Sequence, residues 1–226
     1  MSDAMSDFSA PEPVSARLPM LRLDNLTKRY DTHVVFNNLS YTFTPGCVAL
    51  CEEESTGKST LLGIIAGILA PDGGDILIDN LSVVRSPAQA LARLSWVPDN
   101  CLQAPMQTGR GMLQEVAARK NAVLDEAVMD LARRLDLEPH LDKRFEQMST
   151  GMRRKVYLTA AALGDPAVIV ADGPDGGLDG RARAVLGEQF NAWAKAGKVV
   201  VFSSFDTELL NACNARVFNI RDHAGH

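Results

Sequence analysis

The residues best suited to chemistry lie between positions 48 and 62, in the run V-A-L-C-E-E-E-S-T-G-K-S-T-L-L. The pattern predicts an apolar strand, a tight loop, and a helix that begins at Gly57, Lys58, Ser59 and Thr60. Backbone N–H groups and the positive end of a helix favour an anionic phosphate at such a place. The second half of the G-x-x-x-x-G-K-[ST] pattern is complete, and it therefore predicts a phosphate-binding loop.

The first half of this pattern is different, because Glu52 stands where the first glycine belongs and Glu53 and Glu54 follow it. A like charge about 4 Å from a phosphate costs ~1 kcal/mol in water-like surroundings, and several times that where solvent is partly excluded. A side chain at Glu52 also adds ~1 kcal/mol to a backbone conformation with positive φ. We therefore expect a loop of altered shape in which Lys58 pairs with Glu53 or Glu54. The alternative is a solvated, charged turn.

Length and composition describe an ordinary globular chain. Its 226 residues can bury one sizeable core, and 46% hydrophobic with 23% charged residues is typical of such proteins. The net charge of −5 provides no broad basic field, so nucleic acid is not an expected partner. The cysteines form no C-x-x-C pair, which favours reduced, partly buried thiols in a cytoplasmic protein. They are Cys47, Cys51, Cys101 and Cys213.

Membrane contact is expected only through a partner. The longest apolar stretch, within residues 61–70, is about half the length of a membrane-spanning helix. The N-terminus has no basic region followed by an apolar one, so no signal peptide is predicted. Residues 1–17 are polar and contain prolines, and we expect a flexible tail before a single domain at 18–226.

Short β-type runs follow from Leu21, and L-R-L-D, H-V-V-F and L-S-Y-T-F predict an antiparallel sheet with one solvated face. Residues 48–51 form a continuous apolar run, typical of a central buried strand. The helix after this run has apolar side chains nearly all round, so deep packing is expected. They are Leu61, Leu62, Ile64, Ile65 and Ile68.

The rest of the chain alternates strands and helices. Helical periodicity occupies about 100–164 and the segment from Val185 to Trp193. Apolar strands that alternate with helices predict a parallel sheet covered by helices. The expected fold class is therefore α/β, with a parallel core sheet, an antiparallel β subdomain and a helical insertion at about 100–164. Further strands are expected at 75–79, 94–97, 167–172, 198–204 and 216–221.

Five landmarks occur in a particular order and spacing. They are Tyr30 after L-T-K-R, G-K-S-T at 57–60, W-V-P-D at 96–99, M-S-T-G-M-R-R at 148–154, and V-I-V-A-D-G-P-D-G-G-L-D at 168–179. Together they resemble the nucleotide-binding domain of ABC transporters, and the resemblance covers nearly the whole chain from Leu21. It implies a P-loop NTPase-type fold that works as a dimer beside a transmembrane permease.

The resemblance also implies roles for individual residues. Tyr30 would stack on adenine, and Gly57–Thr60 would hold the phosphates. Candidates for Mg²⁺ are Ser59, Asp99 and Asp172. No cofactor is firmly expected, because ATP and Mg²⁺ would be used only if nucleotide binding survives the altered loop. The four histidines are scattered and predict no metal site.

The groups that the family uses for hydrolysis are replaced in this sequence. Gly173 follows Asp172, where the family has a glutamate that acts on the attacking water. Phe205 stands at the position of the switch histidine, and a phenyl ring can neither bind a phosphate by hydrogen bonds nor relay a proton. Asp99 replaces the glutamine of its loop. We therefore expect a degenerate, non-hydrolysing member with no catalytic residue of its own.

The segment at 148–154, here called the signature segment, keeps part of the pattern that the family presents to the opposite subunit. Ser149, Gly151 and Asp179 match residues that act across the dimer. The alternative is structural, because serine before a helix is a common N-cap. Arg153 and Arg154 are expected to be solvated charges.

The sequence thus predicts a non-hydrolysing ATP-binding-type subunit of a membrane transport complex, paired with a competent ATPase. A slow but genuine ATPase and a regulatory scaffold on the same fold stay open as alternatives. A P-loop small-molecule kinase is disfavoured by the signature segment. Cargo and direction of transport are not predicted.

Overall fold

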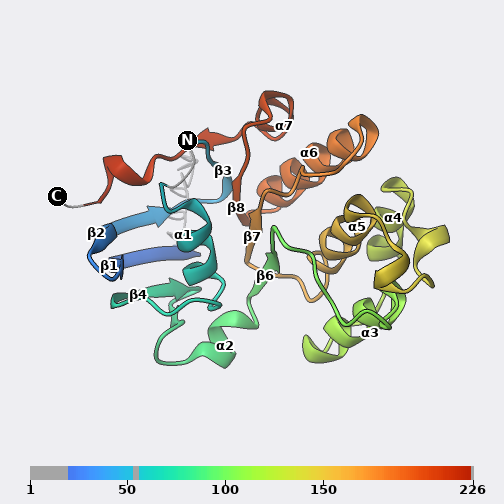
Figure 1. Ribbon diagram of the computed structural model, residues 1–226, viewed down its shortest axis with the longest axis horizontal. Coiled ribbons are helices and arrows are strands. Elements are labelled where there is room, and N and C mark those ends of the chain that lie inside the picture. The colour runs from blue at the N-terminus through green and yellow to red at the C-terminus, as the bar shows by residue number, and fades with distance from the viewer. Residues whose placement is uncertain (1–19, 53–55, 225–226) are drawn as a thin grey trace, which may run out of the picture.

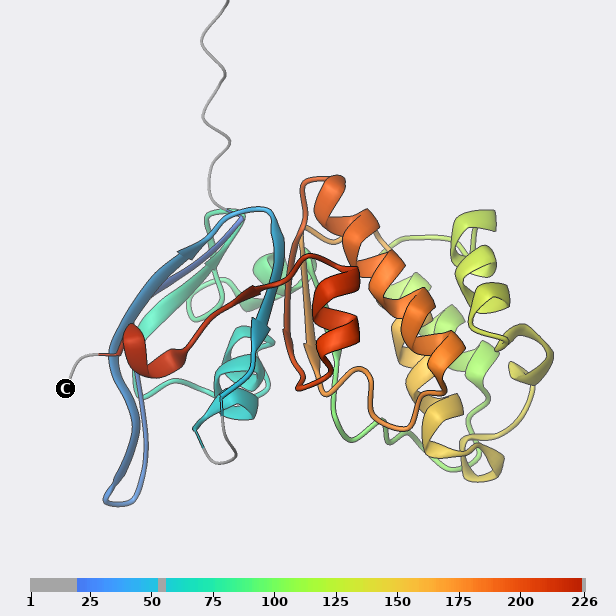
Figure 2. The same ribbon diagram turned by 90° about the horizontal axis from the view of Figure 1, so that it is seen from above.

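The computed structural model describes residues 20–52 and 56–224 (Figure 1). The expected tail at 1–17 and the glutamates Glu53 and Glu54 lie outside the described residues. Two sheets and two groups of helices make up the described part of the chain, and one core lies on each face of the parallel sheet (Figures 1 and 2).

The antiparallel sheet has the order β2-β1-β4-β5. Its strands are β1 (Leu21–Tyr30), β2 (His33–Phe43), β4 (Gly73–Ile78) and β5 (Leu81–Ser82). The runs H-V-V-F and L-S-Y-T-F, expected as two strands, form the single strand β2. The pairing register shifts where Leu26 faces Leu39 and Lys28 faces Phe36, and Asn38 takes a φ of 50° there. Because this bulge absorbs the extra residue, the strand continues through the polar Asn37–Asn38 pair.

The parallel sheet has the order β6-β7-β8-β3-β9. Its strands are β6 (Leu94–Val97), β7 (Val168–Asp172), β8 (Val199–Ser203), β3 (Gly46–Leu50) and β9 (Arg216–Val217). The strand expected in the middle, β3, lies next to the edge, and the strand expected at 216–221 is only two residues long. The chain leaves β9 for a 3₁₀ turn, η3 (Ile220–Asp222), whose first N–H groups bind a side chain instead of a strand.

Alternation along the buried strands divides the interior in two. In β7, Val168 and Val170 face α1 (Lys58–Ile65), whereas Ile169 and Ala171 face the helices on the other side. Helix α1 is packed between the two sheets (Figure 2). The expected burial of Ile68 is wrong: the helix ends before Gly67, whose φ of 69° turns the chain outward, and Ile68 is 65% exposed.

The helices after residue 100 gather beside the parallel sheet, away from α1 (Figures 1 and 2). A side-chain oxygen caps the N-terminus of each long helix in this group. These helices are α3 (Gly109–Arg119), α4 (Glu126–Arg134), α5 (Thr150–Ala160) and α6 (Gly180–Lys195). Shorter elements that the periodicity did not indicate are α2 (Pro87–Leu91), η1 (Glu138–His140), η2 (Phe145–Gln147) and α7 (Thr207–Ala212).

A largely buried lysine joins α3 to the parallel sheet. The amino group of Lys120 donates to Ser95 Oγ at 2.6 Å and to the backbone oxygen of Leu163 at 3.1 Å. Burial, and then the charge of Lys198, lower the pKa of Lys120 to about 8 from its ordinary value of 10.5. Between these two values the unfolded chain binds more protons at this residue than the folded chain does, so folding stability is expected to rise with pH in this window.

Replacing Lys120 by methionine should therefore remove this rise. We expect the free energy of unfolding of the wild type, relative to that of Lys120→Met, to increase by roughly 1–3 kcal/mol between pH 8 and about 10.5. Urea unfolding at a series of pH values measures the difference, and Lys195→Met, at an exposed position in α6, is the control. Parallel profiles for wild type and Lys120→Met would contradict the assignment.

Candidate functional site

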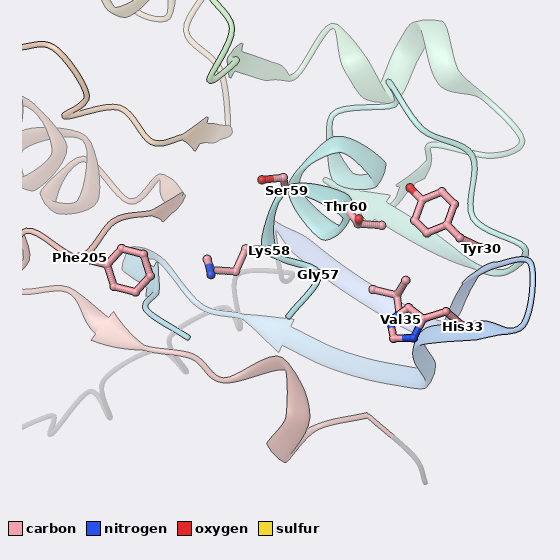
Figure 3. Close-up of a pocket in the computed structure, with 8 residues that line it drawn as sticks. All are labelled: Tyr30, His33, Val35, Gly57, Lys58, Ser59, Thr60 and Phe205. Carbon is pink, nitrogen blue, oxygen red and sulfur yellow. The ribbon is translucent and has the colours of Figure 1, made fainter. Parts of the chain in front are cut away.

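A pocket of about 420 Å³ opens at the N-terminal end of α1 (Figure 3). The β1–β2 hairpin supplies one wall, the start of α1 the floor, and the segment after β8 the far side. The structure thus brings together the predicted adenine-stacking and phosphate-binding positions with the residue at the switch position. The lining residues are Tyr30, His33, Val35, Gly57, Lys58, Ser59, Thr60 and Phe205.

Gly57 is required by its surroundings. Its φ is 92°, and a Cβ atom there would lie 2.4 Å from Cγ1 of Val35. The glycine therefore lets the β2 strand approach the start of α1 closely. No side chain caps α1 among the described residues, and its N-terminal turn faces the pocket. This half of the loop has the geometry of an anion site.

Glu52 is not among the described residues that line this pocket. Its carboxylate accepts hydrogen bonds from the backbone N–H of Ile220 at 2.9 Å and of Arg221 at 3.3 Å, so it binds the C-terminal turn. Its backbone also has no positive φ. The expected positive φ at Glu52 is therefore wrong, and its carboxylate is bound by two N–H donors of the C-terminal turn. Pairing of Lys58 with Glu53 or Glu54 stays a prediction.

The amino group of Lys58 lies between a backbone oxygen and an aromatic ring. It donates to the backbone oxygen of Glu52 at 2.5 Å, and it stands 5.1 Å from the centre of the Phe205 ring (Figure 3). Phe205 is 60% exposed and offers the cation its face. The side chain at the switch position thus contacts the lysine and has no group to donate to a ligand.

The end of β7 is held by a serine that our sequence interpretation passed over. The hydroxyl of Ser203 donates to Oδ1 of Asp172 at 2.6 Å, and it accepts from the N–H of Gly173 at 2.8 Å. Asp172 is buried, and Gly173 has a φ of 52°. The pairing of β7 with β8, which sets Asp172 opposite Ser203, is what could have indicated this contact.

The three Mg²⁺ candidates are in different surroundings. Ser59 lines the pocket, whereas Asp99 and Asp172 are not among the described residues that line it. Oδ1 of Asp99 lies 3.4 Å from Nη2 of Arg154. Within residues 20–52 and 56–224, no group of three or more His, Cys, Asp or Glu side chains could hold a metal ion. Because Mg²⁺ in a nucleotide site takes most of its ligands from phosphates and water, with one or two protein oxygens, the role of these three residues stays a prediction.

The three residues expected to act across a dimer have contacts within the chain. Ser149 is exposed and caps α5 by accepting from the N–H of Met152 at 3.2 Å. Asp179 caps α6 by accepting from the N–H of Ala182 at 2.8 Å, and this bond, above all, lowers the pKa of Asp179. A Cβ atom on Gly151 would lie 2.3 Å from the backbone oxygen of Gly177. These contacts give each residue type a structural reason within the chain, and the expected role across a dimer stays a prediction.

The family model for ABC transporters matches residues 36–176, which include the Gly57–Thr60 end of the pocket, β7 and the signature segment. The chain belongs to the ABC transporter family. The predicted α/β architecture of an ABC ATPase domain is confirmed as well, since solved structures of that kind share its fold.

One curated relative is the Nod factor export ATP-binding protein I of Paraburkholderia xenovorans (strain LB400), 30% identical over 191 residues. The alignment covers 81% of this chain and 62% of that relative, so the chain spans about three fifths of its length. A solved ATP-binding subunit of an ABC transporter superposes with a TM-score of 0.78 at 23% identity, over 89% of this chain and 86% of that one. A dimeric ATP-binding cassette in a post-hydrolysis state, bound to ADP and Pi, gives 0.73 at 20% identity, over 88% and 94%.

Proposed function

We propose that this ABC family member is an ATP-binding-type subunit that does not hydrolyse ATP, and that it works beside a transmembrane permease and a competent ATPase subunit. The observation that carries this proposal is the state of the hydrolytic positions. Gly173 has no side chain, the ring of Phe205 lies against Lys58, and Asp99 is engaged by Arg154. The relatives that are named as export ATP-binding proteins support the transport context.

Hydrolysis requires a group that orients or deprotonates a water beside the γ-phosphate. In the family this group follows the Walker B aspartate, which corresponds to Asp172. Asp175 is the next carboxylate along the chain, but it is not among the described residues that line the pocket. Its Oδ1 atom is buried and has no hydrogen-bond partner among the described residues. No described Asp or Glu side chain is among the residues that line this pocket, which supports the proposal.

Binding is a separate matter from hydrolysis, and the pocket fits a nucleotide only in part. Gly57–Thr60 form the phosphate end, and Tyr30, which is 48% exposed, borders the other end. When bound, ATP would supply the phosphates that join two such domains across a dimer. The residues of this chain would hold those phosphates at α1, but the glutamates at 52–54 and the missing first glycine of the loop predict low affinity.

We expect the isolated chain to bind Mg-ATP more weakly than low-micromolar affinity and to show no measurable hydrolysis. Gly173→Glu should not restore activity. At a φ of 52° its Cβ atom would lie 3.2 Å from Oδ1 of Asp99, which brings two carboxylates together. Calorimetry and a phosphate-release assay on highly purified chain test both parts. Low-micromolar affinity would contradict the expected weak binding, and a Mg-dependent rate in the unmodified chain would favour the slow-ATPase alternative.

The proposed partners follow from the signature segment and from the relatives of this chain. Among the described residues no helix is long and apolar enough to span a membrane. We propose a position at the cytoplasmic face of the membrane, where a permease would anchor the chain. We also propose a head-to-tail dimer, in which Ser149, Gly151 and Asp179 face the phosphates bound by the partner. A solved cassette of the same fold is a dimer bound to ADP and Pi, which supports the dimeric state.

A further inference from the structure

Arg154, one turn into α5, is a buried cation. Only 3% of it is exposed, so the expectation of a solvated charge is wrong. Its Nη1 atom donates to the backbone oxygens of Asp172, at 3.2 Å, and of Gly173. Its Nη2 atom donates to the backbone oxygen of Asp99 at 2.8 Å and lies 3.4 Å from the Asp99 carboxylate. One side chain therefore joins α5 to the segments that follow β6 and β7.

Two glycines leave room for this guanidinium group. A Cβ atom on Gly176 would lie 3.3 Å from Nη2 of Arg154, and one on Gly173 would lie 3.9 Å from Nη1. The glycine at the position of the catalytic glutamate and the buried arginine are therefore parts of one arrangement. A side chain at Gly176 would crowd the guanidinium group, whereas a Cβ atom at Gly173 would be in ordinary contact with it.

The chemistry of this contact requires arginine. A buried cation is costly unless hydrogen bonds replace its water, and several acceptors do so here. Guanidinium is a planar fork with five N–H donors, so it can bind carbonyl groups on separate segments at once. Lysine has the same charge, but its donors radiate from a single atom at the end of the chain. The contact of Arg154 with the segments after β6 and β7 is here called the junction. Loss of the arginine should therefore loosen the junction even when the positive charge is kept.

We propose that Arg154 is a positioning residue, which holds the signature segment in a fixed orientation relative to the ends of β6 and β7. Ser149 and Gly151 lie within five residues of Arg154 on the same helix turns, so an anchored Arg154 also orients them. The role rests on the proposed function, because the oriented residues would face the phosphates bound by the partner subunit.

Hydrogen exchange on the full chain tests the junction without any partner. Arg154→Met should speed amide exchange at 99–102 and 172–178 by at least about tenfold, with little change in β1 and β2. Arg119→Met, which breaks an exposed ion pair with Glu115 on α3, should leave both regions unchanged. Unchanged exchange at 99–102 and 172–178 in Arg154→Met would overturn the proposal.

Chemical rescue tests whether the planar guanidinium group is required at the junction, or whether a positive charge or a side chain of similar volume is sufficient. Millimolar methylguanidinium should restore the slow exchange of Arg154→Ala, whereas an equal concentration of sodium chloride should not. Arg154→Lys should exchange as fast as Arg154→Met. Full protection in Arg154→Lys would show that the charge alone is sufficient, and the positioning role would then be wrong. If Arg154→Met does not fold, Arg154→Lys and the rescued Arg154→Ala still decide the question.

The reconstituted complex separates this inference from the proposed function. Ser149→Arg, Arg154→Met and Arg154→Ala should each lower the ATPase rate of the partner subunit. Methylguanidinium should recover the rate of Arg154→Ala and should not recover that of Ser149→Arg. If Ser149→Arg lowers the rate and Arg154→Met does not, the positioning role fails and the proposed function stands. If Ser149→Arg has no effect, the proposed function fails, and the positioning role that rests on it fails too.

Discussion

Replacing Ser149 by arginine is expected to lower the ATPase rate of a competent dimer partner by roughly 100-fold, the loss seen when one donor to a developing charge is removed. Ser149 is exposed at the N-terminus of α5, where its hydroxyl and the positive end of the helix could meet a γ-phosphate. An arginine there would remove the hydroxyl and fill the space for the phosphate. The rate is measured in the reconstituted complex at saturating ATP.

The control must account for the lost helix cap. Thr108 caps α3 in the same way, because its side chain accepts from the N–H of Gly111 at 3.0 Å. Thr108→Arg should therefore cost a similar stability, about 1 kcal/mol, without changing the partner's rate. If the two variants give equal rates close to that of the wild type, the chain is a scaffold and makes no contribution to the partner's site.

Gly151→Ala is expected to lower the free energy of unfolding by about 1–3 kcal/mol. The added Cβ atom would lie 2.3 Å from the backbone oxygen of Gly177, and neither backbone can yield cheaply. The signature segment and the turn before α6 would have to separate. Urea unfolding of the isolated chain measures this loss without any partner or nucleotide.

Gly180→Ala is the matched control, since among the described residues no heavy atom lies within 4 Å of a Cβ added there. Gly180 begins α6, where alanine favours the helix by up to ~1 kcal/mol over glycine. The two variants should therefore change stability in opposite directions, and equal stabilities would contradict the close approach at Gly177. A substitution such as Gly151→Asp disturbs folding as well as any dimer contact, so Ser149→Arg is the cleaner test of the dimer.

Much of the architecture could be predicted from the sequence, because the relevant signals are local. Apolar runs placed β7 and β8 within a residue or so of their bounds, and helical periodicity located α4, α5 and α6. The G-K-S-T motif located the start of α1 and the phosphate end of the pocket. These features depend on neighbours a few positions apart, and the family pattern placed them in order.

The partners of charged side chains were decided only by the tertiary structure. Glu52 binds N–H groups 168 and 169 residues further along the chain, and Arg154 contacts Asp99, 55 residues before it. In the sequence, a glutamate in a phosphate loop predicts repulsion, and an arginine on a helix predicts solvation. Whether a charge repels a ligand, faces water or joins two segments depends on which donors and acceptors the fold brings within about 3 Å. The sequence by itself thus determined the family and which residues stand at the positions that the family uses for catalysis, and the packing of distant segments determined what those residues contact.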